Sequence, residues 1–223
     1  MVGASFIYDT LDNPLRPTSG VRLELSEDVA GLGGDVFYFA SEVEGHYFMP
    51  LFFEGVVLQL KGTAGHIEGW NGKEVPIIDR YFKGADSFRG FARAGVGPRM
   101  DSADGTRTDS IGGKTYAIGT VEVTFPVGLP EDWGLEGAVF TDFGTVFNAP
   151  EKTLTEADEG CDDVSAAVDV CEVFDSATLR ASVGAGMIWQ SPFGPLRLDV
   201  AWPLAKADFD RTELVRFSVG TRF

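Results

Sequence analysis

The densest cluster of arginine, glycine and aromatic residues in the chain lies in one long segment, residues 70–113. Within it, Phe88-Arg89-Gly90-Phe91 places an arginine between two rings and beside a glycine. A guanidinium has a flat fork of N–H donors, so it can bind a carboxylate while its plane stacks on a ring. This chemistry suits insertion of the segment into a confined polar space. The alternative interpretation is a surface loop with solvated arginines.

A strand predicted at residues 134–146 carries candidate partners for this arginine. Side chains of a strand alternate between two faces, so residues two apart point the same way. Phe140 and Asp142 therefore share a face, and this face also carries Glu136. They offer a ring and a carboxylate together, which are the two groups that one guanidinium can bind at once.

Alternating hydrophobicity runs through most of the chain and predicts the elements that position these residues. Near the C-terminus, for example, Val215, Phe217 and Val219 alternate with Arg216 and Ser218. The pattern predicts an all-β, antiparallel fold. Its nine strands are expected at residues 3–10, 21–30, 36–48, 56–69, 115–126, 134–146, 178–190, 195–203 and 213–223.

Several features favour a transmembrane β-barrel over a soluble β-sandwich, which also alternates. The second face of successive strands carries charged residues and glycine, as the wall of a wet lumen would. Short turns alternate with longer loops, about 70–113 and 147–177 among them, although two connections on the long-loop side are short. The four tryptophans lie at or near predicted strand ends, where outer-membrane barrels have aromatic girdles.

Nine strands are an unusual number for such a barrel. Bacterial single-chain barrels have even strand numbers, and an open edge in lipid leaves backbone groups unpaired at several kcal/mol each. Residues 1–5 lack the basic start and apolar core of a signal peptide, so a signal was removed or the chain begins within a longer protein. We expect the strands to belong to a larger barrel or to pair with another chain.

The composition excludes several other classes. With 18 Lys and Arg against 34 Asp and Glu, the net charge is −16, which argues against nucleic acid as a partner. No apolar stretch is long enough for a transmembrane helix. His46 and His66 have no arrangement with a base or nucleophile, so we predict no enzymatic activity, no cofactor and no metal.

Residues 150–178 form an acidic stretch with nine carboxylates and one lysine. Their spacing does not match an EF-hand, and a solvated outer loop is the favoured interpretation over a calcium site. The stretch contains both cysteines, Cys161 and Cys171. They would form a local disulfide in an oxidising compartment, and two free thiols are the alternative.

Five segments, taken together, resemble the BamA family of outer-membrane protein assembly factors within the bacterial surface antigen superfamily. Ser87–Phe91 resembles the Arg-Gly-aromatic loop motif of the family, and residues 8–20 resemble its periplasmic turn. Residues 140–147 resemble a lumen strand, 189–199 the penultimate hairpin, and 217–223 the closing strand. The matches follow the family's order from end to end.

The resemblance implies a sixteen-stranded barrel, of which residues 1–223 are the C-terminal part, with the family's periplasmic POTRA domains absent. Segment 70–113 would be the family's lumen-inserted loop, whose motif arginine engages an aromatic residue and an aspartate. Carried over by position, these are Arg89 with Phe140 and Asp142.

The implied activity is the folding and insertion of other barrel proteins in the outer membrane of a Gram-negative bacterium, without a nucleotide or metal. Client strands would pair at a lateral seam between the first and last strands. The implied partners are unfolded outer-membrane clients, outer-membrane lipid, and assembly lipoproteins that bind through POTRA domains.

The end of the chain has a second interpretation. Val215, Phe217, Val219, Gly220 and the terminal Phe223 form the candidate seam strand, but they also resemble the sorting signal of outer-membrane proteins in general. An exposed strand edge is physically a template for strand addition. Two further hypotheses remain: a TamA-like or two-partner secretion pore, and a passive barrel or adhesin from a truncated gene.

Overall fold

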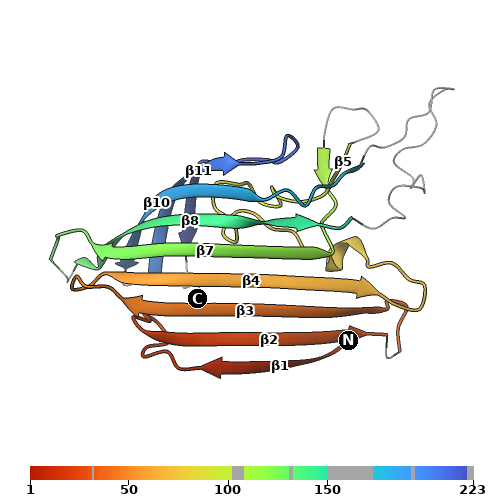
Figure 1. Ribbon diagram of the computed structural model, residues 1–223, viewed down its shortest axis with the longest axis horizontal. Helices are drawn as coiled ribbons and strands as arrows, with labels where there is room; N and C mark the ends of the chain where they lie inside the picture. Colours follow the sequence, from red (N-terminus) through yellow and green to blue (C-terminus); the bar gives the residue numbers. More distant parts are fainter. Residues whose placement is uncertain (32, 102–107, 131–132, 150–172, 192–193, 220–223) are drawn as a thin grey trace.

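The computed structural model describes residues 1–31, 33–101, 108–130, 133–149, 173–191 and 194–219. Its main element is one antiparallel sheet of nine strands, which lie side by side in the order of the chain (Figure 1). These strands are β1 (Val2–Asp9), β2 (Gly20–Ala30), β3 (Tyr38–Pro50), β4 (Val57–Gly69), β7 (Thr115–Pro126), β8 (Leu135–Phe147), β10 (Arg180–Ser191), β11 (Gly194–Ala205) and β12 (Val215–Val219). The predicted antiparallel all-β fold is confirmed.

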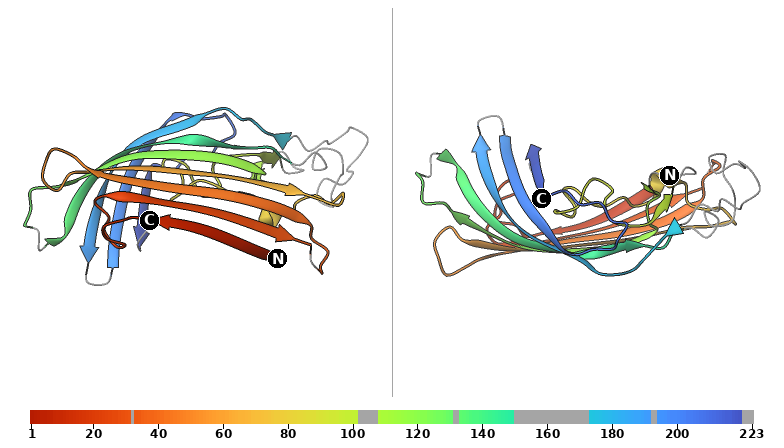
Figure 2. Two further views of the ribbon diagram at one scale, coloured as in Figure 1. Left: turned by 60° about the horizontal axis from the view of Figure 1, so that its bottom comes forward. Right: turned by 90° about the horizontal axis from the view of Figure 1, so that it is seen from above.

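The sheet curves strongly but does not close. Figure 2 shows a trough with β1 at one end of the strand order and β12 at the other. Connections 10–19, 51–56, 127–134 and 192–193 join strands at one end of the trough, and the longer connections 70–114 and 148–179 lie at the other. The short connections 31–37 and 206–214 also lie at this second end, so the separation of short turns from long loops is partial, as expected.

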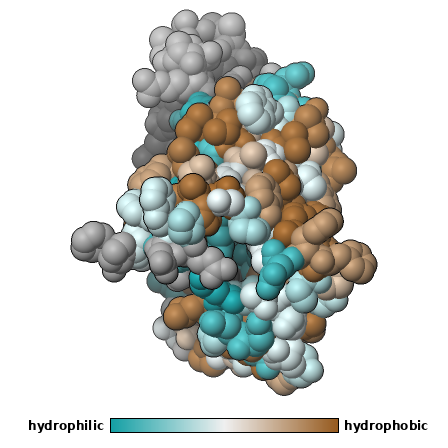
Figure 3. Space-filling model, turned by 90° about the vertical axis from the view of Figure 1, so that its left-hand side faces the viewer, coloured by the Kyte–Doolittle hydropathy of each residue, from teal (hydrophilic) through white to brown (hydrophobic). Residues whose placement is uncertain are grey.

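Period-2 alternation gives the two faces different chemistry. Large apolar side chains on the convex face remain exposed, including Val139, Phe143 and Phe217 at 47%, 42% and 62%. The concave face buries polar groups instead, among them His46 and Asp142. Viewed from the end with the short turns, hydrophilic residues gather in the middle and hydrophobic ones along much of the rim (Figure 3).

A second, smaller sheet was not predicted. It pairs β5 (Arg99–Asp101) with both β6 (Thr108–Ser110) and β9 (Val173–Phe174), and a short 3-10 helix, η1 (Ile77–Asp79), precedes it. Strands of two or three residues are too short for alternation to reveal them. Among the described residues, no helix is long and apolar enough to cross a membrane.

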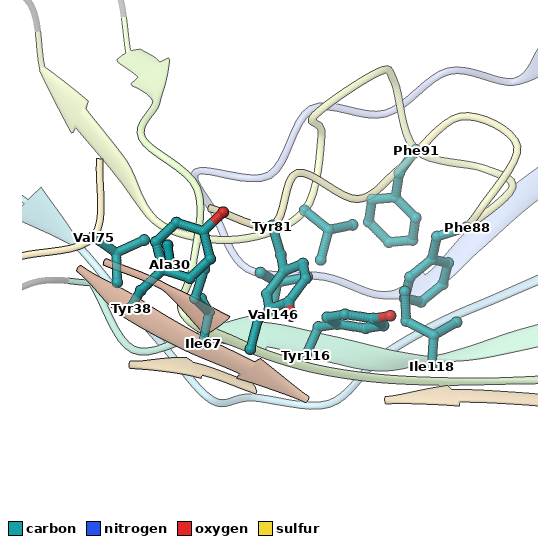
Figure 4. Packing of buried hydrophobic residues seen from close by; sticks show 12 residues of the cluster. Ala30, Tyr38, Ile67, Val75, Tyr81, Phe88, Phe91, Tyr116, Ile118 and Val146 are labelled. Atoms are coloured by element: carbon teal, nitrogen blue, oxygen red, sulfur yellow. The ribbon is translucent and has the colours of Figure 1, made fainter. Parts of the chain in front are cut away.

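The hydrophobic core lies between the concave face and the segment that follows β4. Figure 4 shows rings and aliphatic side chains from both partners in contact. Phe88 and Phe91 come from the segment, and Tyr116, Ile118 and Val146 come from the strands beneath it. Burial of these groups favours docking of the segment because it removes apolar surface from water.

Candidate functional site: a buried arginine on the concave face

The segment 80–98, here called the arginine loop, is held across the concave face by backbone hydrogen bonds (Figure 2). At its stem, Tyr81 and Gly113 exchange N–H to carbonyl bonds of 2.9 and 3.0 Å. Near its tip, the Ala85 N–H donates to the Phe91 carbonyl at 2.9 Å. These bonds close a tight turn that carries Arg89.

Arg89 binds Asp142 through three donors. Its Nε and its backbone N–H donate to Asp142 Oδ2 at 2.8 and 3.0 Å, and Nη2 donates to Oδ1 at 2.7 Å. The guanidinium carbon lies 3.4 Å from the centroid of the Phe140 ring. The structure thus brings together all three residues that the sequence singled out, with the carboxylate only 1% exposed.

A second carboxylate and a second arginine extend this contact. Arg89 Nη1 also donates to Glu122 of β7, and Arg197 of β11 donates to the same carboxylate at 2.8 and 2.9 Å. The Arg197 Nε in turn lies 2.8 Å from Asp199 Oδ2. We call these five charged residues the lumen cluster: Arg89, Glu122, Asp142, Arg197 and Asp199. In the sequence, Glu122 alternates with the apolar Val121 and Val123, but the contacts of Glu122, Arg197 and Asp199 were not predicted.

Gly90 allows the loop to approach the sheet closely. Its φ is +87°, a conformation that L side chains rarely adopt, and a Cβ at this position would lie 2.9 Å from the Ser182 Cβ. The Ser182 hydroxyl donates to the Arg89 carbonyl at 2.5 Å. The glycine of the motif is therefore required by the backbone, independently of the arginine beside it.

The two rings of the motif anchor the loop in the core. Phe88 and Phe91 are 0% and 1% exposed and pack edge to face, with ring centroids 4.8 Å apart. Such pairs add to the stabilisation from area burial. The motif thus combines an ionic contact with apolar anchoring on either side of it.

Two residues at the stem of the loop, Tyr81 and Lys83, have shifted pKa values. Lys83 Nζ lies 3.7 Å from the centroid of the Tyr116 ring, and burial lowers the pKa of this lysine. Burial raises the pKa of the Tyr81 hydroxyl. In both residues burial removes the side chain from water and so disfavours its charged form, which is the protonated lysine and the deprotonated tyrosine.

A second buried arginine was not predicted. Arg180, at the start of β10, is 0% exposed and binds Asp210 in the connection 206–214, with Nε to Oδ2 at 3.0 Å. Its Nη1 donates to Thr145 Oγ1 and to the carbonyls of Ser176 and Thr178. The only signal in the sequence was an arginine on the polar face at the outer end of a strand.

The connection 206–214 also lies along the arginine loop. The Ala92 N–H donates to the Arg211 carbonyl at 2.9 Å, and the Arg211 N–H donates to the Gly95 carbonyl at 3.0 Å. The Glu213 N–H donates to the Gly90 carbonyl at 3.2 Å. Backbone pairing therefore joins two connections that are more than 100 residues apart in sequence.

The remaining predicted residues lie either on β12 or outside the described residues. Val215, Phe217 and Val219 are exposed on the convex face of β12, whereas Gly220 and Phe223 lie outside the described residues. The proposed pair Cys161 and Cys171 and most of the acidic stretch also lie outside them. In the part of the chain that the structure describes, no group of three or more His, Cys, Asp or Glu could hold a metal ion.

Comparisons with known proteins agree on one family for this chain. The model of the Omp85 superfamily domain matches residues 1–223. The outer membrane protein assembly factor BamA of Neorickettsia risticii is 36% identical over 222 residues, which cover 100% of this chain and 27% of that protein. BamA of Neisseria meningitidis is 27% identical over 218 residues, covering 95% of this chain and 27% of that protein.

A solved structure agrees with these sequence matches. The crystal structure of BamA from Haemophilus ducreyi lacking POTRA domains 1-3 aligns with a TM-score of 0.79 at 27% identity, covering 98% of this chain and 41% of that one. The chain spans about a quarter of the length of the curated relatives named above. It belongs to the Omp85 superfamily and forms part of a bacterial outer-membrane β-barrel of the BamA type.

Proposed function

We propose that this chain is the C-terminal part of a BamA-like barrel that folds and inserts other outer-membrane proteins. The observation that carries the proposal is the buried contact of Arg89 with Asp142 and Phe140, in a chain that is 36% identical to a BamA over its whole length. The H. ducreyi and N. risticii proteins are both named BamA. The full name of the N. risticii protein, outer membrane protein assembly factor, gives the proposed substrate class, which is outer-membrane proteins.

In this proposal Arg89 locks the arginine loop inside the barrel. A guanidinium and a carboxylate that are both removed from water attract each other strongly, but only as long as both are present. Loss of Arg89 leaves the buried Asp142 carboxylate without the cation of its described ion pair, whereas loss of Asp142 leaves Arg89 with Glu122 alone. The contact therefore favours one docked position of the loop over undocked ones.

The strand that would receive clients is β12. Among the described residues, Val215–Val219 pair with β11, and β12 ends the strand order of the described sheet. A free strand edge presents N–H and carbonyl groups that can pair with an incoming strand. Unfolded outer-membrane proteins are the proposed clients, outer-membrane lipid surrounds the convex face, and assembly lipoproteins would bind through POTRA domains outside this sequence.

The experiment compares the native protein with Arg89→Ala and Arg93→Ala variants in lipid vesicles. Arg93 lies on the same loop but is exposed, which makes it a matched control for loss of one arginine. The readout is the rate at which an unfolded small outer-membrane barrel becomes protease-resistant. We expect Arg89→Ala to slow insertion several-fold and Arg93→Ala to leave it unchanged.

Two results would contradict the proposal. Equal insertion rates for the native protein and Arg89→Ala would show that the contact of Arg89 is not needed for insertion of clients. Steady ion conductance by the native protein without any client insertion would favour a passive pore instead.

A further inference from the structure

Asp86 of the arginine loop contacts the last strand. Its Oδ1 accepts hydrogen bonds from Arg216 Nε at 2.8 Å and from Ser218 Oγ at 2.9 Å. Its Oδ2 lies 3.4 Å from Arg216 Nη2. One carboxylate on the loop therefore binds two consecutive polar side chains on the concave face of β12.

This contact is specific for the register of β12. Arg216 and Ser218 are two residues apart and share the concave face, whereas Val215, Phe217 and Val219 point to the convex face. A slip of one residue exchanges the two faces of a strand. An apolar side chain would then face the Asp86 carboxylate, and both side-chain donors would be lost. A slip of two residues that brings Val215 opposite Leu198 keeps the faces but puts Leu214 opposite Asp199, in the place of Arg216.

β12 has little else to fix its register among the described residues. Five of its described residues pair with β11, from Val215 with Val200 to Val219 with Leu196, and the Ala201 N–H continues this ladder with one bond of 2.9 Å to the Leu214 carbonyl. By comparison, β11 pairs with β10 from Gly194 to Ala205. No other described strand pairs with β12. A short ladder on one edge tolerates slippage more readily than a long ladder on both edges.

The segment that leads into β12 is held by the same loop. The Glu213 N–H donates to the Gly90 carbonyl, and the Glu213 carboxylate accepts a bond from Arg216 Nη1 at 3.0 Å. Arg216 thus lies between two carboxylates, one on the loop and one just before the strand. The start of β12 and its body are both attached to the turn that carries Arg89.

We propose that Asp86 is a positioning residue that sets the register of β12 and so couples the docked arginine loop to the strand at the seam. The register assignment stands on the contacts of Asp86 alone. Its consequence for client strands rests on the function proposed above, because only then is the β12 edge a template. Undocking of the loop would withdraw Asp86 and loosen β12 at the same moment.

Cysteine pairs can measure the register directly. In a background with Cys161→Ser and Cys171→Ser, one variant carries Leu198→Cys with Phe217→Cys, which are register partners. A second variant carries Leu198→Cys with Val215→Cys, which become partners after a slip of two residues. The ratio of disulfide yields after mild oxidation, without clients, reports the population of each register.

We expect Asp86→Ala to lower the ratio of native to shifted disulfide several-fold, with Asp86→Asn between it and the parent. Ser218→Ala should change the ratio in the same direction. Glu74→Gln removes one charge from an exposed position earlier in the same connection and should leave the ratio unchanged. Asp86→Asn is nearly isosteric, so it keeps the test decisive if Asp86→Ala does not fold.

An unchanged ratio in both Asp86 variants would overturn the proposal, as would an equal change in Glu74→Gln. Client insertion measured on the same samples separates this proposal from the proposed function. Absence of insertion by the parent protein would refute the function but leave the register assignment to be decided by the disulfides.

Discussion

Two of the buried arginines, Arg89 and Arg180, are neutralised in different ways. Arg89 comes from a loop and reaches two carboxylates on two strands, Glu122 and Asp142. Arg180 comes from a strand and reaches one carboxylate, Asp210, on a connection. Both contacts attach a connection to the wall of the barrel, but only the lumen cluster around Arg89 has more than one charge of each sign.

The difference lies in how each site tolerates the loss of one partner. Within the lumen cluster, Glu122 is shared by Arg89 and Arg197, so either arginine retains a carboxylate when Glu122 is lost. Arg180 has Asp210 as the one carboxylate in its described ion pairs, supplemented by neutral acceptors. Shared charges give a tolerant site, whereas a single buried pair gives a fragile one.

The largest effect is therefore expected at Asp210. Asp210→Ala leaves the Arg180 charge completely buried without a carboxylate, which should cost about 3–5 kcal/mol of unfolding free energy. Urea unfolding of the native protein in lipid vesicles measures this loss. Asp208→Ala, an exposed aspartate in the same turn, is the control and should change stability little. Equal losses for the two variants would refute the role of the pair.

A smaller effect is expected from Gly90→Ala, which keeps every charge of the lumen cluster. The positive φ and the close approach to Ser182 should cost about 1–3 kcal/mol. The readout is protease cleavage within the arginine loop at urea concentrations below global unfolding. Equal protection of the loop in the variant and the parent would contradict this expectation, because it would show that a Cβ at position 90 is tolerated.

The smallest effect is expected from Glu122→Gln. Arg89 keeps Asp142, Arg197 keeps Asp199, and the cluster changes from three carboxylates with two guanidinium groups to an equal number of each. The loss should be about 1 kcal/mol, the size of an ordinary hydrogen bond. A loss as large as that of Asp210→Ala, in the same vesicles and denaturant, would show that the charges are not shared.

The strands and the pairing partners of Arg89 were predictable for different reasons. Alternation determines which residues share a face, so Phe140 and Asp142 were placed together from local pattern alone. Their contact with Arg89 joins residues more than 50 positions apart. The chemistry of the side chains made them candidate partners, and the resemblance to a family assigned the contact. Period-2 patterning contains no information about which loop lies against which face.

The contacts of Arg180 and Asp86 were not predictable for the same physical reason. Both form between a strand and a connection whose path depends on the packing of the whole trough. Asp210 and Asp86 lie in loops without periodicity, where the sequence does not distinguish a carboxylate in a specific contact from a solvated one. The small sheet of β5, β6 and β9 was missed because strands of two or three residues are too short for an alternating pattern to be recognised.

The central claim is that Arg89 and Asp142 hold the arginine loop through direct interaction. A double-mutant cycle of Arg89→Ala and Asp142→Ala, measured by urea unfolding in vesicles, isolates this interaction from the other effects of each substitution. We expect a coupling free energy of about 2–3 kcal/mol, so that the double variant is much less destabilised than the sum of the single variants. Additive losses, with a coupling free energy near zero, would contradict this claim.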